Sequence, residues 1–251
     1  MQEDTGTIPA PDGTPIAYRR IAASDGGGAP GILFLGGFNS DMTGTKAEAL
    51  AQFAQRTGRA YCRFDYAGHG SSGGAFEEGC ISRWASDAQM VLDALTTGPQ
   101  ILVGSSMGGW IACLLAKARP ARVHALVGIA PAPDFTEDLM WAQFPPEIRA
   151  TIAREGVWYR PSEYGAPYPI TRTLIEDGRR NLVLREPLEC PFPVRILQGM
   201  SDIDVPWPHA VKLAEHITGT DLRLTLIKDG DHRLSRPQDI ALLEAEIAGL
   251  A

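Results

Sequence analysis

The sequence has no long apolar run and no cluster of basic residues. No stretch approaches the roughly 18 consecutive apolar residues that a membrane-spanning helix needs. The formal net charge is −7, from 23 Lys and Arg residues against 30 Asp and Glu residues. The clustered cations that bind nucleic acids or anionic membrane surfaces are therefore missing. We expect neither a membrane span nor a nucleic-acid partner.

Cysteine is scarce and dispersed, and the chain start resembles no targeting signal. The four cysteines contain no CxxC pair, which favours free thiols in a reducing compartment over disulfides or a zinc site. The first 15 residues are acidic and lack both the apolar core of a secretory signal and the Arg-rich character of a transit peptide. We expect a cytoplasmic protein.

Apolar patterns typical of strands alternate with helical patterns along most of the 251 residues. This length can bury a full core without disulfides or metal ions. The alternation predicts a mainly parallel central sheet with helices on both faces, an α/β fold that opens with a hairpin. Strands are predicted at 7–9, 16–21, 31–35, 60–64, 100–103, 123–129, 194–197 and 222–227, and helices at 46–55, 81–95, 108–119, 209–217 and 237–250.

The segment from about residue 131 to 187 interrupts this alternation. It is rich in Pro and aromatic residues and has helical stretches but no clear strand. We interpret it as a cap inserted between two sheet strands of a single domain that spans 1–251. Trp141, Trp158 and Tyr159 are candidates for substrate binding. The alternative is that these aromatic side chains only pack the cap onto the body.

A serine in the pattern G-x-S-x-G is the candidate nucleophile. Gly104-Ser105-Ser106-Met107-Gly108 follows a predicted strand and opens a predicted helix. A sharp turn in that position lifts the serine hydroxyl above the sheet. The pattern occurs a second time around Ser72, in a glycine-rich stretch with no helix directly after it. The context therefore favours Ser106 as the nucleophile and a structural role for Ser72.

A serine hydroxyl needs a neighbouring base, and the chain has five histidines. His232 lies in a short loop after the strand predicted at 222–227, at the sheet edge where α/β folds place their sites. It also follows the serine in the chain order Ser, acid, His of G-x-S-x-G hydrolases. For the other four we expect packing of His124, a turn at His69, and a surface location for His209 and His216.

Three aspartates could orient the imidazole of His232. Asp202 and Asp204 both follow the predicted strand at 194–197, and Asp134 follows an earlier strand. The developing oxyanion would need two backbone N–H donors. Met107 follows the nucleophile at a helix N-terminus, and Phe38 follows the glycines after the strand at 31–35. These are the predicted donors, and the chemistry needs neither a metal ion nor an organic cofactor.

With these residues in hand, the chain resembles α/β-hydrolases of the group that contains the mammalian mitochondrial acyl-glucuronide esterase, also described as a palmitoyl-protein thioesterase. The resemblance is carried by residues 37–47, 63–72, 98–110, 156–158, 199–207 and 231–233. It implies an esterase or thioesterase with Ser106, Asp202 and His232 as catalytic triad. It selects Asp202 because the group's pattern G-x-x-D-x-x-V-P places its acid there. The chain start departs from these relatives, which suggests a bacterial member.

The expected reaction is attack of Ser106 on an ester or thioester carbonyl, in a small molecule such as an acyl glucuronide or in an acylated protein. Acyl transfer to an alcohol or thiol and hydrolysis of a carbon–carbon bond are alternatives that use the same triad. A non-catalytic ligand-binding protein is a further alternative, disfavoured because such proteins commonly lack a triad member. The sequence does not determine the oligomeric state.

Overall fold

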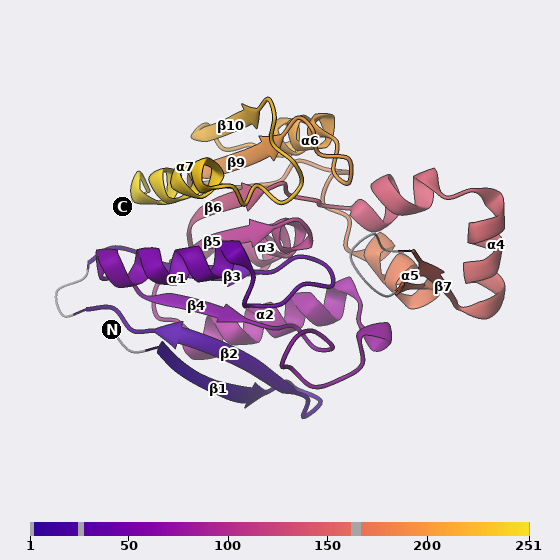
Figure 1. Ribbon diagram of the computed structural model, residues 1–251, viewed down its shortest axis with the longest axis horizontal. Helices are drawn as coiled ribbons and strands as arrows, with labels where there is room; N and C mark the ends of the chain where they lie inside the picture. The colour runs from indigo at the N-terminus through magenta and orange to yellow at the C-terminus, as the bar shows by residue number, and fades with distance from the viewer. Residues whose placement is uncertain (1–2, 25–27, 162–166, 251) are drawn as a thin grey trace.

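The computed structural model describes residues 3–24, 28–161 and 167–250. An eight-stranded sheet forms its centre, in the order β1-β2-β4-β3-β5-β6-β9-β10 (Figure 1). The strands are β1 (Glu3–Pro9), β2 (Pro15–Ile21), β3 (Gly31–Leu35), β4 (Tyr61–Phe64), β5 (Gln100–Ser105), β6 (Val123–Ile129), β9 (Val194–Gly199) and β10 (Leu222–Ile227).

The sheet is parallel from β4 to β10, and only the β1–β2 hairpin runs antiparallel to its neighbours. The parallel strands β3, β5 and β9 are buried along their whole length, as expected for continuous apolar runs covered on both faces. The predicted fold class, a mostly parallel sheet between helices, is confirmed.

Helices cover both faces of the sheet. Side chains alternate along a strand, so Ile32 and Phe34 of β3 pack into the core on one face and Leu33 and Leu35 into the core on the other. The first core includes residues of α1 (Thr45–Thr57) and α7 (Pro237–Ala248). The second includes residues of α2 (Ile81–Leu95), α3 (Met107–Ala118) and α6 (Trp207–His216). None of the described helices is long and apolar enough to cross a membrane.

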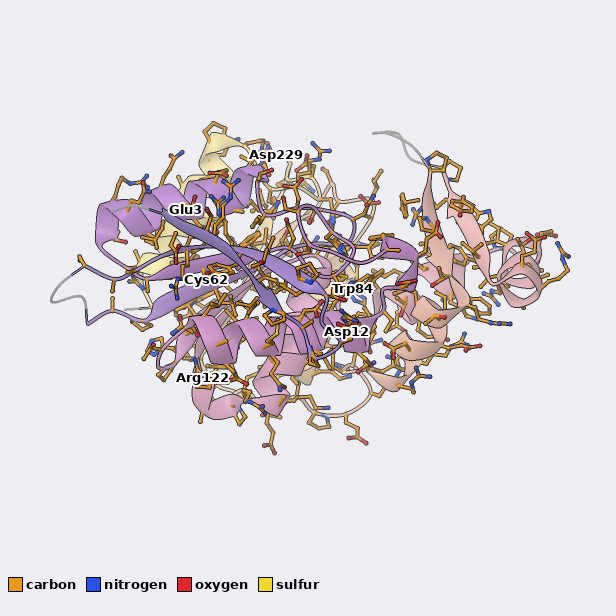
Figure 2. All side chains as sticks on the ribbon, turned by 90° about the horizontal axis from the view of Figure 1, so that it is seen from below. Glu3, Asp12, Cys62, Trp84, Arg122 and Asp229 are labelled. Atoms are coloured by element: carbon orange, nitrogen blue, oxygen red, sulfur yellow. The ribbon has the colours of Figure 1, made fainter. Side chains whose placement is uncertain are left out.

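The hairpin is tied to α2 at its turn. Asp12, between β1 and β2, accepts hydrogen bonds from the guanidinium of Arg83 on α2. The next residue, Trp84, is fully buried, and its indole N–H donates to the carbonyl of Ala67 at 3.1 Å. Figure 2 shows Asp12 and Trp84 close together where the hairpin turn meets α2. These contacts fix the loop that follows β4.

The chain between β6 and β9 lies beyond the carboxyl ends of the parallel strands (Figure 1). It contains α4 (Pro146–Glu155) and α5 (Arg172–Arg180), two short helical turns, η3 (Thr136–Met140) and η4 (Trp141–Gln143), and two strands, β7 (Val157–Arg160) and β8 (Tyr168–Thr171). We call residues 131–187 the cap. The expectation of no strand there is wrong: β7 and β8 pair as an antiparallel hairpin. β7 has one β-branched and two aromatic residues, and β8 has two β-branched residues and one aromatic residue, all of which favour extended backbone.

Candidate active site

Ser106 lies at a sharp turn between β5 and α3. Its φ of 54° and ψ of −117° are strained for a residue with a side chain. The flanking glycines make the turn possible, because a Cβ on Gly104 would lie 2.4 Å from the carbonyl oxygen of Gly108. A Cβ on Gly108 would lie 2.0 Å from the carbonyl oxygen of Leu35 on β3. Both contacts are shorter than any real Cβ allows, so only glycine fits.

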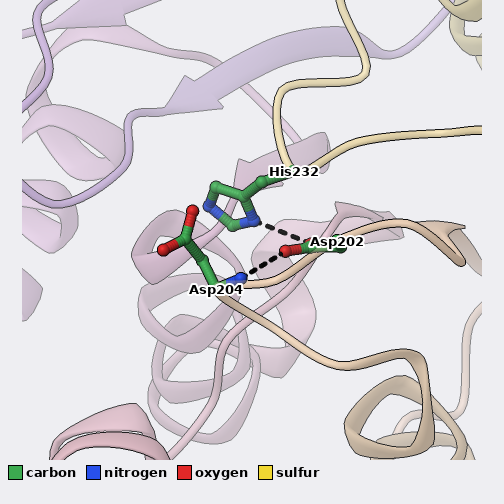
Figure 3. A group of neighbouring side chains, drawn as sticks. All are labelled: Asp202, Asp204 and His232. Carbon is green, nitrogen blue, oxygen red and sulfur yellow. Dashed lines mark hydrogen bonds and ion pairs between the residues drawn. The ribbon is translucent and has the colours of Figure 1, made fainter. Parts of the chain in front are cut away.

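The structure brings Ser106, His232 and Asp202 together. Nε2 of His232 lies 3.1 Å from Oγ of Ser106, and Nδ1 lies 2.8 Å from Oδ2 of Asp202 (Figure 3). Because a carboxylate only accepts, Nδ1 donates to Asp202, which leaves Nε2 free to accept the serine proton. The three residues follow β5, β9 and β10, whose carboxyl ends meet at the same edge of the sheet.

The geometry distinguishes the three candidate acids. Oδ1 of Asp202 accepts the backbone N–H groups of Asp204 and Val205 at 2.9 and 2.8 Å, and Oδ2 also accepts from Nε2 of Gln198 at 3.1 Å. The Asp202 side chain is fully buried. The hydrogen bonds hold both of its carboxylate oxygens in place. Asp204 is exposed. Asp134 faces away, because its carboxylate accepts from the backbone N–H groups of Val183 and Leu184 at the end of the cap.

The predicted oxyanion donors lie on two chain segments next to Ser106. Met107 begins α3, and Phe38 follows Gly37, where a Cβ would lie 3.5 Å from Cβ of Ser106. Among the residues that the structure describes, none accepts a hydrogen bond from the backbone N–H of Met107 or Phe38. Two unpaired donors beside a nucleophile can stabilise a tetrahedral oxyanion.

His69 has a role that its position in a glycine-rich loop did not suggest. Its Nδ1 donates to the carbonyl of Ala67 and its Nε2 accepts the backbone N–H of Asn39, both at 3.2 Å. Burial lowers the pKa of His69 to about 4, so the imidazole stays neutral and keeps its acceptor. Asn39 follows Phe38 and has a φ of 55°. His69 therefore anchors the loop that carries the Phe38 N–H.

The remaining histidines bond to backbone carbonyls and not to Ser106. His209 is buried, with Nε2 2.7 Å from the carbonyl of Pro133, so the expected surface location of His209 is wrong. It lies on the side of α6 that meets the beginning of the cap, a contact between segments far apart in the sequence. His124 packs against the carbonyl of Leu250, and His216 bonds within its own helix.

The second G-x-S-x-G pattern forms a structural turn, as expected. Oγ of Ser72 donates to the carbonyl of Asp65 at 2.7 Å and accepts the backbone N–H of Ala17 at 2.8 Å. The first bond ties the glycine-rich loop to the end of β4, and the second ties it to β2. The hydroxyl is therefore engaged in holding two chain segments together rather than facing an imidazole.

Aromatic side chains of body and cap meet at Phe38. Its ring contacts Phe76, Trp84, Phe135 and Tyr168 edge-on, with centroids 5.0–5.8 Å apart. Phe135 was not among the predicted site residues, although the chain that follows a sheet strand such as β6 is where site residues collect.

The predicted substrate-binding aromatic residues lie within or at the rim of the cap. Trp158 packs on Phe144 at 5.4 Å between centroids. Trp141 lies beneath the guanidinium groups of Arg149 and Arg179. Tyr159 is half exposed, and its hydroxyl donates to Glu77 on the body at 2.9 Å. Their part in substrate binding stays a prediction.

Asp202, Asp204 and His232 also have the side-chain types that bind metal ions, with ligand atoms within 4.8 Å of one another. However, both oxygens of Asp202 and both ring nitrogens of His232 are already engaged in hydrogen bonds. A metal ion would have to displace those bonds, so this donor set fits a proton-transfer site better than a metal site.

A mostly parallel sheet with a serine on the turn after β5, and a histidine and an aspartate after the last two strands, defines an α/β-hydrolase. The sequence profile of the serine aminopeptidase S33 family matches residues 31–173. The chain therefore belongs to the serine aminopeptidase S33 family of α/β-hydrolases, and is a hydrolase.

Individual relatives agree with this assignment. The mitochondrial palmitoyl-protein thioesterase ABHD10 of Bos taurus is 42% identical over 235 residues, which cover 93% of this chain and 75% of that protein. The structure of mouse ABHD10 superposes with a TM-score of 0.89 at 37% identity, covering 98% of both chains. The crystal structure of a protein described as a hydrolase, from Agrobacterium vitis S4, superposes with a TM-score of 0.95 at 46% identity, covering 100% of this chain and 99% of that one. The resemblance found in the sequence is confirmed.

Proposed function

We propose that this protein hydrolyses carboxylic ester or thioester bonds through an acyl-enzyme intermediate on Ser106. The observation that carries the proposal is the continuous hydrogen-bond path from Oγ of Ser106 through His232 to Asp202, with distances of 3.1 and 2.8 Å. A neutral imidazole in this tautomer is the general base that a serine hydroxyl needs.

In the first half-reaction, Oγ of Ser106 attacks the carbonyl carbon while Nε2 of His232 takes the hydroxyl proton. The carbonyl oxygen becomes an oxyanion, which accepts hydrogen bonds from the backbone N–H groups of Met107 and Phe38. The imidazolium then gives its proton to the leaving alcohol or thiol, and the carbonyl bond re-forms on Ser106. Asp202 stabilises the imidazolium without becoming protonated.

In the second half-reaction, water takes the place of the leaving group. His232 removes a proton from the water, whose oxygen attacks the acyl carbon. The proton then passes to Oγ of Ser106, which releases the free acid. The same two N–H donors serve both oxyanions because the carbonyl oxygen stays in one place.

The acyl group of the substrate is proposed to lie against the aromatic residues at the cap–body junction. Phe38 carries an oxyanion donor and also contacts Phe135 of the cap base and Tyr168 of β8. An apolar acyl chain held there would extend from the reacting carbonyl. The relatives named palmitoyl-protein thioesterase support a fatty acyl thioester, in a small molecule or an acylated protein; an acyl glucuronide presents the same kind of carbonyl.

Labelling with a fluorophosphonate probe tests the nucleophile, because the probe reacts only with an activated serine. Ser106→Ala is expected to lose labelling and to lower thioester turnover by on the order of 10⁴–10⁶-fold. Ser72→Ala is the matched control from the second G-x-S-x-G pattern, and it should still label. Undiminished turnover by Ser106→Ala would overturn the proposal.

Substitution of the two neighbouring aspartates tests the acid. Asp202→Asn is expected to lower kcat by on the order of 10⁴-fold, because the amide can hold the wrong tautomer of His232. Asp204→Asn should retain turnover of a neutral ester to within several-fold. A series of acyl thioesters of increasing chain length, with an acyl glucuronide alongside, then defines the preferred acyl group.

A further inference from the structure

A carboxylate that has no task in the proposed mechanism lies beside the catalytic imidazole. An oxygen of Asp204 is within 4.8 Å of a ring nitrogen of His232 and of an oxygen of Asp202. Figure 3 shows this carboxylate beside the imidazole, on the side of the nitrogen that is not bonded to Asp202. That nitrogen, Nε2, is the one that faces Ser106.

The backbone fixes Asp204 while its side chain stays open to solvent. Its N–H donates to Oδ1 of Asp202, and the next residue, Val205, donates to the same oxygen. The Asp204 side chain is exposed, and no side chain or backbone group in the described parts of the chain donates a hydrogen bond to its carboxylate. An anchored backbone with an unpaired charge at the rim of a site is suited to meeting a ligand.

The proposed mechanism determines which part of the substrate lies near the Asp204 carboxylate during the reaction. Nε2 of His232 delivers the proton to the leaving alcohol or thiol, so the leaving atom must come within hydrogen-bond distance of Nε2. A charged group a few bonds beyond that atom therefore lies within about one Debye length, roughly 8–10 Å, of Asp204. The acyl part extends from the other side of the carbonyl carbon, and its contribution cancels when substrates with the same acyl group are compared.

The cap carries a charge of the opposite sign that acts on the same tyrosine as Asp204. Burial raises the pKa of the Tyr168 hydroxyl, the charge of Arg160 lowers it and the charge of Asp204 raises it. Tyr168 of β8 therefore lies within electrostatic reach of one cation on the cap and one anion on the body. An oxygen of Asp204 also lies within 4.8 Å of a ring nitrogen of His232.

We propose that Asp204 is a specificity-determining residue that selects the leaving group by charge. This inference rests on the proposed esterase or thioesterase function. The carboxylate favours substrates whose leaving alcohol or thiol is cationic or neutral and disfavours those whose leaving group carries a carboxylate, sulfonate or phosphate. Peptide thiols flanked by Lys or Arg and amine-bearing alcohols fit this site better than anionic thiol carriers or glucuronic acid.

Three thioesters with the same acyl group test the proposal. Their leaving thiols are thiocholine, 2-mercaptoethanol and 2-mercaptoethanesulfonate, which are cationic, neutral and anionic. Release of each thiol is followed with a chromogenic disulfide at low ionic strength and neutral pH. In the wild type, kcat/KM should fall in the order cationic, neutral, anionic, and the spread should shrink in 0.5 M salt because the charges are then screened.

Asp204→Asn should lower the ratio of kcat/KM for the cationic thioester to that for the anionic one by about ten- to a hundredfold. The ratio is the readout because the loss of a charge beside the imidazole changes the turnover of all three substrates by a common factor. Asp204→Lys should lower this ratio further. The matched control is Glu189→Gln, which removes an exposed carboxylate at the amino end of β9. This control should preserve the wild-type order.

The outcomes separate this inference from the function on which it rests. An unchanged ratio of cationic to anionic kcat/KM in Asp204→Asn, with turnover still dependent on Ser106, would overturn the role of Asp204 alone. A wild-type preference for the anionic thioester would also overturn it. Absence of thioester turnover in the wild type, with no fluorophosphonate labelling, would instead remove the proposed function.

Discussion

The buried His69 makes the stability of this protein sensitive to mild acid. Its folded-state pKa of about 4 lies below the ordinary value of 6.5 because burial disfavours the charged ring. The unfolded chain therefore binds a proton to this histidine as the pH falls below 6.5, while the native state does not. The contribution of His69 to the free energy of unfolding is fully present above about pH 6.5. It is lost as the pH falls to about 4, by about 3 kcal/mol in total.

The perturbation that isolates this contribution is His69→Gln, which keeps a neutral acceptor for the Asn39 N–H and removes the titration. Between pH 7.5 and 4.5, the wild-type free energy of unfolding should fall by about 2.5 kcal/mol more than that of the variant. Urea unfolding followed by tryptophan fluorescence at both pH values measures the difference. His216→Gln, a partly exposed histidine on α6, controls for the loss of a histidine elsewhere.

The same position links stability to turnover. His69→Leu removes the acceptor of the Asn39 N–H and frees the loop that carries Phe38, so kcat should fall about tenfold, a part of what an oxyanion donor contributes. His69→Gln should keep kcat within about threefold. Parallel stability curves for wild type and His69→Gln, or equal kcat for the Leu and Gln variants, would refute the role assigned to this imidazole.

Two further variants test the turn at Ser106 and the base of the cap. Gly108→Ala forces a Cβ to within 2.0 Å of the Leu35 carbonyl and should lower the free energy of unfolding in urea by about 3 kcal/mol or more. The control Gly249→Ala, whose Cβ would lie 3.6 Å from its nearest atom, should lower it little. Equal losses in the two variants would contradict the steric argument. Asp134→Asn leaves one of two buried N–H groups unpaired and should cost about 1–3 kcal/mol. The backbone N–H groups of Val183 and Leu184 should then exchange hydrogen faster in this variant. Unchanged exchange would contradict the role of the Asp134 carboxylate in holding them.

The sequence predicts the elements of the sheet well because their signals are local. The strand at 31–35 and the helix at 81–95 begin and end where the patterns place them, since a buried apolar run and an amphipathic repeat can be recognised without knowing their partners. The meeting of Ser106, His232 and Asp202 is also predictable, because parallel strands place their carboxyl ends at one edge of a sheet.

Features that depend on long-range contacts are not predictable in this way. Nothing near His69 in the sequence indicates that it accepts a hydrogen bond from Asn39, and nothing near His209 indicates that Pro133 covers it. The hairpin of β7 and β8 was missed because each strand has four residues and gains its stability from its partner. The position of Asp204 beside the imidazole likewise depends on how the loop after β9 is folded.

The hydrogen bonds of Asp134 join the beginning of the cap directly to its end, at Val183 and Leu184. The intervening chain is therefore a closed loop whose two ends are hydrogen-bonded to each other. Lengthening such a loop costs little conformational entropy, because the entropic cost of loop closure grows only with the logarithm of the loop length. A cap of another length can therefore be accommodated between these two ends, provided that the contacts of Phe135 and Tyr168 with Phe38 are kept.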